Sequence, residues 1–223
     1  MVWAALVAGC HILAEEPQCS PVRRSDLWPA TLVALVALLP FATASMVSLS
    51  VLALYGICTA EPATPLRRSS LVFLAMAGTL IWGRLFLAVF SRPLLDVDTL
   101  FVAVLLGSEH QGNTLWYADG ATRLVVAPGC SSMQGLSLAL LLWVTVNQLF
   151  KVHFGWGPVL WCLAALAATV AINVLRIGAM LQFPQHLEAI HDGWGFHLSM
   201  WAPLIVVGLI CLFGARREIF RRA

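Results

Sequence analysis

The chain has 223 residues, of which 60% are hydrophobic and 11% are charged, and its formal net charge is +2. Soluble domains carry about 25% charged residues, whereas a helix that crosses a bilayer needs about 20 apolar residues. The composition therefore indicates a polytopic membrane protein, and a net charge this small, without a basic stripe, gives no reason to expect a nucleic-acid partner.

The N-terminal part of the chain begins with two apolar stretches of different length. Residues 1–14 lack the basic start and the small-residue cleavage site of a signal peptide, so they are expected to form a short span or an interfacial segment. Residues 27–60 are too many for one span, and Pro40 interrupts them near the middle. Two helices joined by a tight turn at residues 43–45 are therefore expected.

The next two apolar stretches carry charged residues. Residues 69–90 predict a span that contains Arg84, which either snorkels to the headgroups or pairs with Asp96 or Asp98. Residues 94–107 are apolar but short, so they predict either a short span or a re-entrant helix.

The one polar stretch of any size covers residues 108–129. Within it, Asp119-Gly120 separates two β-prone runs, 113–117 and 121–126, which is a signal for a β-hairpin. The hairpin is expected on the membrane surface, directly before the segment APGCSSMQG that leads Cys130 into the next apolar run.

Three further spans are expected at residues 134–150, 159–175 and 196–213, and a basic tail follows at residues 215–223. The fold class is thus all-α, a polytopic transmembrane helix bundle of about six to eight spans with a small extracytoplasmic β-hairpin. A single domain is expected over residues 1–223. Residues 1–93 would form its N-terminal spans and residues 94–214 its catalytic half.

The basic tail fixes an orientation for the second half of the chain. Its arginines, at positions 216, 217, 221 and 222, belong in the cytoplasm by the positive-inside rule. If successive spans alternate in direction, His197, Arg176 and Cys130 all lie on the extracytoplasmic face. Three residues that are distant in sequence would then meet.

The six cysteines form no CxxC pair and no metal-ligand spacing. Cys130 alone has several polar neighbours at the edge of an apolar run, whereas Cys10, Cys162 and Cys211 lie within apolar runs as small hydrophobes. Cys130 is therefore the candidate nucleophile.

Cysteine, arginine and histidine together suit acyl transfer. Cys130 would attack as its thiolate, Arg176 would stabilise the thiolate or an oxyanion, and His197 would act as general acid and base. His186 and His191, in the preceding loop, are alternatives to His197. A metal site is less apt, because arginine is a poor ligand.

At these residues the chain resembles the exosortase/archaeosortase family of membrane cysteine transpeptidases. The resemblance is carried by Cys130-Ser131-Ser132, by the Asn-x-x-Arg motif of Asn173 and Arg176, and by His197 at the start of the last span. It covers residues 94–213, whereas the first 90 residues match only as apolar spans. Ser132 stands where the family usually has glycine, which would matter if the backbone there needed a positive φ.

The resemblance implies a cysteine-dependent peptidase or transpeptidase in a prokaryotic cytoplasmic membrane. Such an enzyme recognises a C-terminal sorting tail of an exported protein, cuts it on the outer face through a thioester, and passes the protein to an acceptor. Its partners would be that tail and the membrane lipids. Neither a metal nor an organic cofactor is required.

Three other functions fit the same sequence. A non-catalytic multi-pass scaffold for envelope or exopolysaccharide assembly would not need the Cys130 thiol. A plain intramembrane protease would use the same residues, with water as the acceptor. A transporter would normally show broken or charged helices near the midplane.

Overall fold

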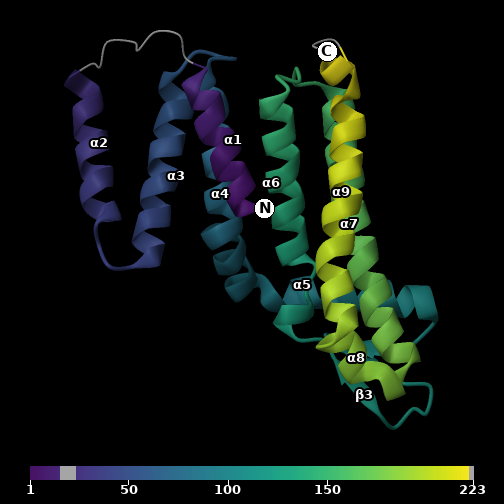
Figure 1. Ribbon diagram of the computed structural model, residues 1–223. Helices are drawn as coiled ribbons and strands as arrows, with labels where there is room; N and C mark the ends of the chain where they lie inside the picture. Colours follow the sequence, from purple (N-terminus) through teal and green to yellow (C-terminus); the bar gives the residue numbers. More distant parts are fainter. Residues whose placement is uncertain (16–23, 221–223) are drawn as a thin grey trace.

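The computed structural model describes residues 1–15 and 24–220 and is largely helical (Figure 1). In chain order its helical elements are α1 (Val2–Ala14), α2 (Arg24–Ala37), α3 (Ala42–Thr59), α4 (Pro65–Ala77), the π-helical turn η1 (Gly78–Trp82), α5 (Gly83–Leu106), the 3₁₀ turn η2 (Pro128–Cys130), α6 (Met133–Leu149), α7 (Trp156–Gln182), the 3₁₀ turn η3 (Pro184–His186), α8 (Leu187–His191) and α9 (Trp194–Phe220). Three short strands, β1 (His110–Gln111), β2 (Thr114–Trp116) and β3 (Arg123–Val125), lie between α5 and η2.

Among the described residues, three helices are long and apolar enough to cross a membrane, at Pro128–Leu149, Trp156–Gln182 and Trp194–Phe220. They match the three spans predicted for the second half of the chain. The number rises to four if Pro65–Ile81 and Gly83–Leu106, a bent pair, form one span. The predicted total of six to eight spans is not confirmed, because the described parts of α1, α2 and α3 are shorter apolar helices than these spans.

The N-terminal helices form a layer beside the three long helices. Figure 1 shows α1 and α4 next to α6, with α3 packed on α4 and α2 outermost, against α3. Residues 27–60 divide into two helices as predicted, and the break lies at Pro40. The turn comes before residue 42, earlier than the expected 43–45, because proline has no N–H with which to continue α2.

A bend of 51° separates α4 from α5. The predicted span at residues 69–90 therefore does not run straight. It passes through the π-helical turn at Gly78–Trp82, and α5 then runs below the start of α6 and behind α7 in Figure 1. π-Helical turns are known points of bending. The buried face of α5 includes Asp98 and Val102, and Val102 belongs to a hydrophobic cluster shared with the sheet and α7.

The predicted hairpin is confirmed and is part of a three-stranded antiparallel sheet of order β1-β2-β3. Leu115 pairs with Leu124, and the turn contains Gly120 at φ +67°. Hydrogen bonds from the Thr122 side chain and main chain, and from the Ala121 main chain, lower the pKa of Asp119. Strand β1 was not expected from the sequence. It pairs His110 with Leu115.

A cluster of charged side chains joins α1, α4 and α6 at the end of the bundle far from the sheet. Arg68 is 5% exposed, binds Glu15 Oε2 at 3.1 Å and donates from Nε to the carbonyl oxygen of Gln148 at 3.0 Å. Lys151 also binds Glu15, at 3.0 Å. We call Glu15, Arg68 and Lys151 the basal clasp. Through it, Arg68 lies at the same end of the bundle as the last turn of α6.

Candidate functional site

Cys130 lies at the end of η2, three residues before the start of α6, and it is 5% exposed. Its side chain belongs to a hydrophobic cluster that joins residues of α5, the sheet, α7 and α8. Pro128 begins the turn with its fixed φ and missing N–H, as is usual at the first position of a helical turn. The sheet and the crossing helix α5 therefore enclose the thiol on the side away from the long helices.

The backbone around Cys130 is fully used in local hydrogen bonds. The N–H groups of Cys130 and Ser131 donate to the carbonyl oxygens of Ala127 and Pro128, at 2.8 and 3.2 Å. Ser132 N–H donates to Asp98 Oδ2 at 2.9 Å, and Met133 N–H donates to Ser131 Oγ at 3.2 Å. The four consecutive N–H groups nearest the thiol are thus engaged, so donors for a reacting oxygen must come from other groups.

His191, the last residue of α8, contacts the thiol. Its Nε2 lies 3.4 Å from Cys130 Sγ, and its Nδ1 lies 2.8 Å from Asp192 Oδ1. The two ring nitrogens therefore face a sulfur and a carboxylate, which is the order found in cysteine–histidine–acid arrangements. The His191 side chain is 43% exposed and that of Asp192 is 78% exposed, so the acid end of this arrangement faces solvent.

Arg176 lies within α7, not at its end as the predicted span 159–175 implied, because α7 continues to Gln182. At about 1.5 Å per residue, Arg176 is about 30 Å from the start of α7, which is about the thickness of a bilayer core. It donates from Nη2 to the carbonyl oxygen of His191 at 3.0 Å, and its guanidinium carbon lies 5.9 Å from the ring centre of Phe196. Arg176 Nε is buried and has no hydrogen-bond partner.

The structure thus brings two of the three sequence-predicted site residues together, and it puts a different histidine beside them. Cys130 and Arg176 both contact His191. His197 lies in the first turn of α9, is exposed, and packs edge-on against Phe196 at 5.8 Å between ring centres. The sequence offered His191 only as an alternative to His197. Little in the sequence singled it out, because α8 is a single short turn within a polar segment.

Asn173 belongs to the same site. It lies one turn before Arg176 on α7 and donates from Nδ2 to the carbonyl oxygen of Cys130 at 2.9 Å. The start of α6 approaches α7 closely at this point, since a Cβ on Gly135 would lie 2.6 Å from Thr169 Cγ2. The small residue allows the two helices to meet, and Asn173 joins them beside the thiol.

Asp98 was predicted only as a possible partner of Arg84, and the structure pairs it with Ser132 instead. Asp98 is 2% exposed, and it accepts from Ser132 N–H at 2.9 Å and from Ser132 Oγ at 2.7 Å. Arg84 is exposed. Ser132 has φ −64° and ψ −17°, so the backbone there needs no positive φ and serine fits without strain.

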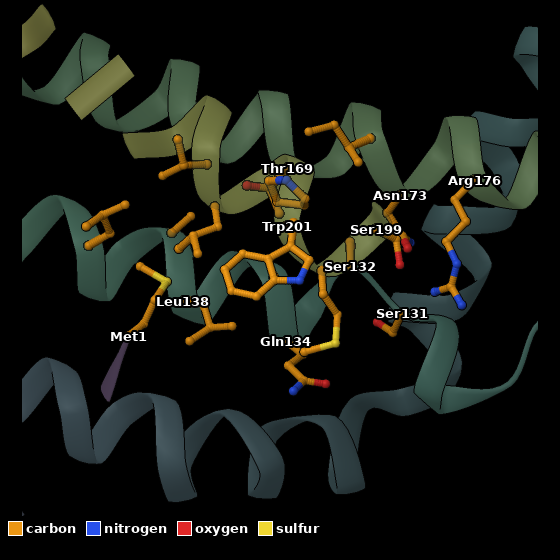
Figure 2. Close-up of a pocket in the computed structure, with 18 of the residues that line it drawn as sticks. Met1, Ser131, Ser132, Gln134, Leu138, Thr169, Asn173, Arg176, Ser199 and Trp201 are labelled. Carbon is orange, nitrogen blue, oxygen red and sulfur yellow. The ribbon is translucent and has the colours of Figure 1, made fainter. Parts of the chain in front are cut away.

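Two cavities meet at Arg176. The first, about 380 Å³, lies between α6, α7 and α9. Figure 2 shows its polar end, with Arg176, Asn173, Ser131 and Ser199 near one another, and the apolar part that continues past Trp201 to Leu138. The second cavity, about 640 Å³, lies between α7, the η3–α8 segment and α9, and both cavities are lined by Ile172, Arg176 and Ser199.

No metal-binding group is found in the part of the chain that the structure describes: no three side chains of histidine, cysteine, aspartate or glutamate are placed to hold an ion. The chemistry that the site offers is that of a thiol with an imidazole at contact distance and a guanidinium beside both. This combination suits nucleophilic attack on a carbonyl group.

Comparisons of the chain with protein-family models, with curated proteins and with solved structures gave no match.

Proposed function

We propose that this chain is a membrane cysteine peptidase or transpeptidase that acts on a C-terminal tail of exported proteins. The observation that carries the proposal is the 3.4 Å contact between Cys130 Sγ and His191 Nε2, with Asp192 on the other ring nitrogen. The sequence resemblance to the exosortase/archaeosortase family names the same cysteine and arginine. His191 takes the general acid–base role that the sequence had assigned to His197.

The reaction would start when His191 Nε2 takes the proton of Cys130 and the sulfur attacks a carbonyl carbon of the tail. The resulting oxyanion would bind Arg176, because the backbone N–H groups of residues 130–133 are already engaged. Collapse of this intermediate would break the C–N bond, and the leaving amine would take the proton from His191. The thioester on Cys130 would then pass to an amine acceptor or to water.

The shape of the site supports acyl transfer. One cavity reaches Gly129 and Ser131 and continues as an apolar groove between α6, α7 and α9, which suits an apolar tail. The second cavity is lined by Arg176 and Ile190, and it would leave room for an acceptor. Two cavities that meet at one arginine fit a reaction with two substrates.

The distribution of basic residues supports a site on the extracytoplasmic face. Lys151 and Arg216 belong to the ends of the long helices that are distant from Cys130, and the basal clasp brings Arg68 to that same end. The positive-inside rule would put this end in the cytoplasm of a prokaryotic cell.

The test is to trap the thioester. Reporter proteins that end in an apolar span and a basic tail, taken from the same organism, are expressed together with this chain, and the purified protein is examined by intact mass spectrometry. We expect an adduct that hydroxylamine removes, and we expect it to be absent from Cys130→Ala and present in the matched variant of an exposed cysteine, Cys58→Ala. An adduct that survives in Cys130→Ala would reject the proposal.

The released reporter distinguishes the two possible outcomes of the second step. A free C-terminal carboxylate would show hydrolysis, and a conjugate would show transfer. If none of the reporters is cut, or if the Cys130→Ala variant cuts them as well, the scaffold alternative replaces the enzyme.

A further inference from the structure

Asp98 is a buried charged group that the proposed reaction does not use. It lies on α5, 34 residues before Ser132, and the residue is 2% exposed. A buried carboxylate is costly unless its oxygens accept hydrogen bonds. Here both do: Oδ2 accepts from Ser132 N–H and Oδ1 accepts from Ser132 Oγ.

The two hydrogen bonds between Asp98 and Ser132 hold the residue that precedes the first turn of α6. Ser132 is the N-cap of α6, and it is two residues from Cys130. Serine at an N-cap commonly bonds to the N–H groups of its own helix. In this chain its hydroxyl instead donates to Asp98 on a different helix. The start of α6 is therefore attached to α5 by these hydrogen bonds.

A second hydrogen bond holds the same segment from the other side. Asn173 on α7 donates to the carbonyl oxygen of Cys130 at 2.9 Å. The backbone of residues 130–132 is thus held between α5 and α7, and His191 contacts the thiol that projects from it. The Asp98 bonds also occupy Ser132 N–H, so this donor does not compete with Arg176 for a reacting oxygen.

We propose that Asp98 is a positioning residue for the Cys130 nucleophile. It holds Ser132, and through Ser132 the turn 130–132, so that the thiol stays within reach of His191 Nε2. The role depends on hydrogen-bond geometry and not on the negative charge of the carboxylate. This inference rests on the proposed function, because it assigns Asp98 to the same nucleophile.

The experiment measures the alkylation rate of Cys130 by iodoacetamide in detergent-solubilised full-length protein, with the other five cysteines replaced by alanine. In Asp98→Asn the amide oxygen can accept from Ser132 N–H and the amide NH₂ can donate to Ser132 Oγ, so both bonds persist without the charge. We expect this variant to stay within about twofold of the parent and Asp98→Ala to be about tenfold slower. Ser132→Ala, which loses only the hydroxyl bond, should fall between them.

A double variant separates positioning from a general loss of structure. If Asp98 acts through the contact between the thiol and His191, then Asp98→Ala should slow alkylation much less in a His191→Ala background than in the parent. An equal slowing in both backgrounds would overturn the proposal. So would an Asp98→Asn variant as slow as Asp98→Ala, or an Asp98→Ala variant as fast as the parent.

Two further outcomes complete the test: one covers a variant that fails to fold, and the other distinguishes this proposal from the proposed function. If Asp98→Ala does not fold, the comparison of Asp98→Asn with Ser132→Ala still decides the matter, since equal rates in both would overturn it. If the parent never forms a thioester but Asp98→Ala still slows alkylation only when His191 is present, then the proposed function fails while Asp98 still positions the thiol.

Discussion

Replacing His191 by alanine should reduce the reactivity of Cys130 far more than replacing His197. The thiol lies 3.4 Å from His191 Nε2, whereas His197 is exposed and packs on Phe196. A hydrogen bond to a charged group contributes about 1.5–3 kcal/mol, and about 1.4 kcal/mol corresponds to a factor of ten in rate. Cys130 in the His191→Ala variant should therefore be alkylated about 10- to 150-fold more slowly.

The exposure of each side chain sets the expected order of the Cys130 alkylation rates among the other variants. The Asp192 side chain is 78% exposed, so its contact with His191 competes with water and is worth about 0.2–1 kcal/mol. Asp192→Ala should slow alkylation by at most about fivefold. His197→Ala is the matched control, because it removes a histidine at the same end of the bundle, and its rate should equal that of the parent.

The assay is pseudo-first-order alkylation of Cys130 as the single cysteine, at neutral pH, followed by mass spectrometry. Denatured samples of each variant provide the control, since they should all react at one rate. If His197→Ala slows the reaction as much as His191→Ala, or if His191→Ala has no effect, the assignment of the base to His191 is refuted.

Three further predictions concern stability. Arg68→Ala should lower the free energy of unfolding by about 1.5–3 kcal/mol, because it removes charge-assisted hydrogen bonds to Glu15 and Gln148. Arg67→Ala is the control, and equal Tm values for the two variants would contradict this prediction. Burial alone would raise the pKa of Glu15, but hydrogen bonds from Lys151 and Arg68, and the charges of both, lower it below its ordinary value of 4.5. A carboxyl group with a lowered pKa contributes stability that is fully present above pH 4.5 and is lost as the pH falls through the lowered pKa. The Tm of the parent should therefore drop between about pH 5 and about pH 2 by more than the Tm of Glu15→Gln. Gly120→Ala should destabilise the hairpin by about 1–2 kcal/mol because the φ of Gly120 is +67°. Faster proteolysis at the turn would show this effect. Gly157→Ala is the control: it lies in the first turn of α7, where a Cβ meets open space, and it should not change the proteolysis rate.

The long helices and the hairpin could be predicted because each has a local cause. Uninterrupted apolar runs produced α6 within one residue of its expected bounds, whereas α7 and α9 each continue about seven residues past their expected ends. Asp119-Gly120 between β-prone runs gave the turn of the β2–β3 hairpin. The break at Pro40 followed from proline chemistry. In each case the residues that determine the structure are neighbours in sequence.

The missed features depend on tertiary packing. The bend at Gly78–Trp82 carries α5 past the start of α6, and this brings Asp98 to Ser132. His191 reaches Cys130 because one short helical turn, α8, packs against α7 and α9. Neither contact has a periodic pattern that would reveal it, since the partners lie 34 and 61 residues apart.

The basal clasp also has a consequence for the order in which the chain assembles. Arg68 binds Glu15, 53 residues earlier, and the carbonyl oxygen of Gln148, 80 residues later. During synthesis, α1 and α4 can pair as soon as both have emerged, but the guanidinium gains its second partner only when the last turn of α6 has been made. By then Cys130 and Ser132 have also been made. The same step that completes the clasp at one end can therefore bring the turn at residues 130–132 onto α5 at the other.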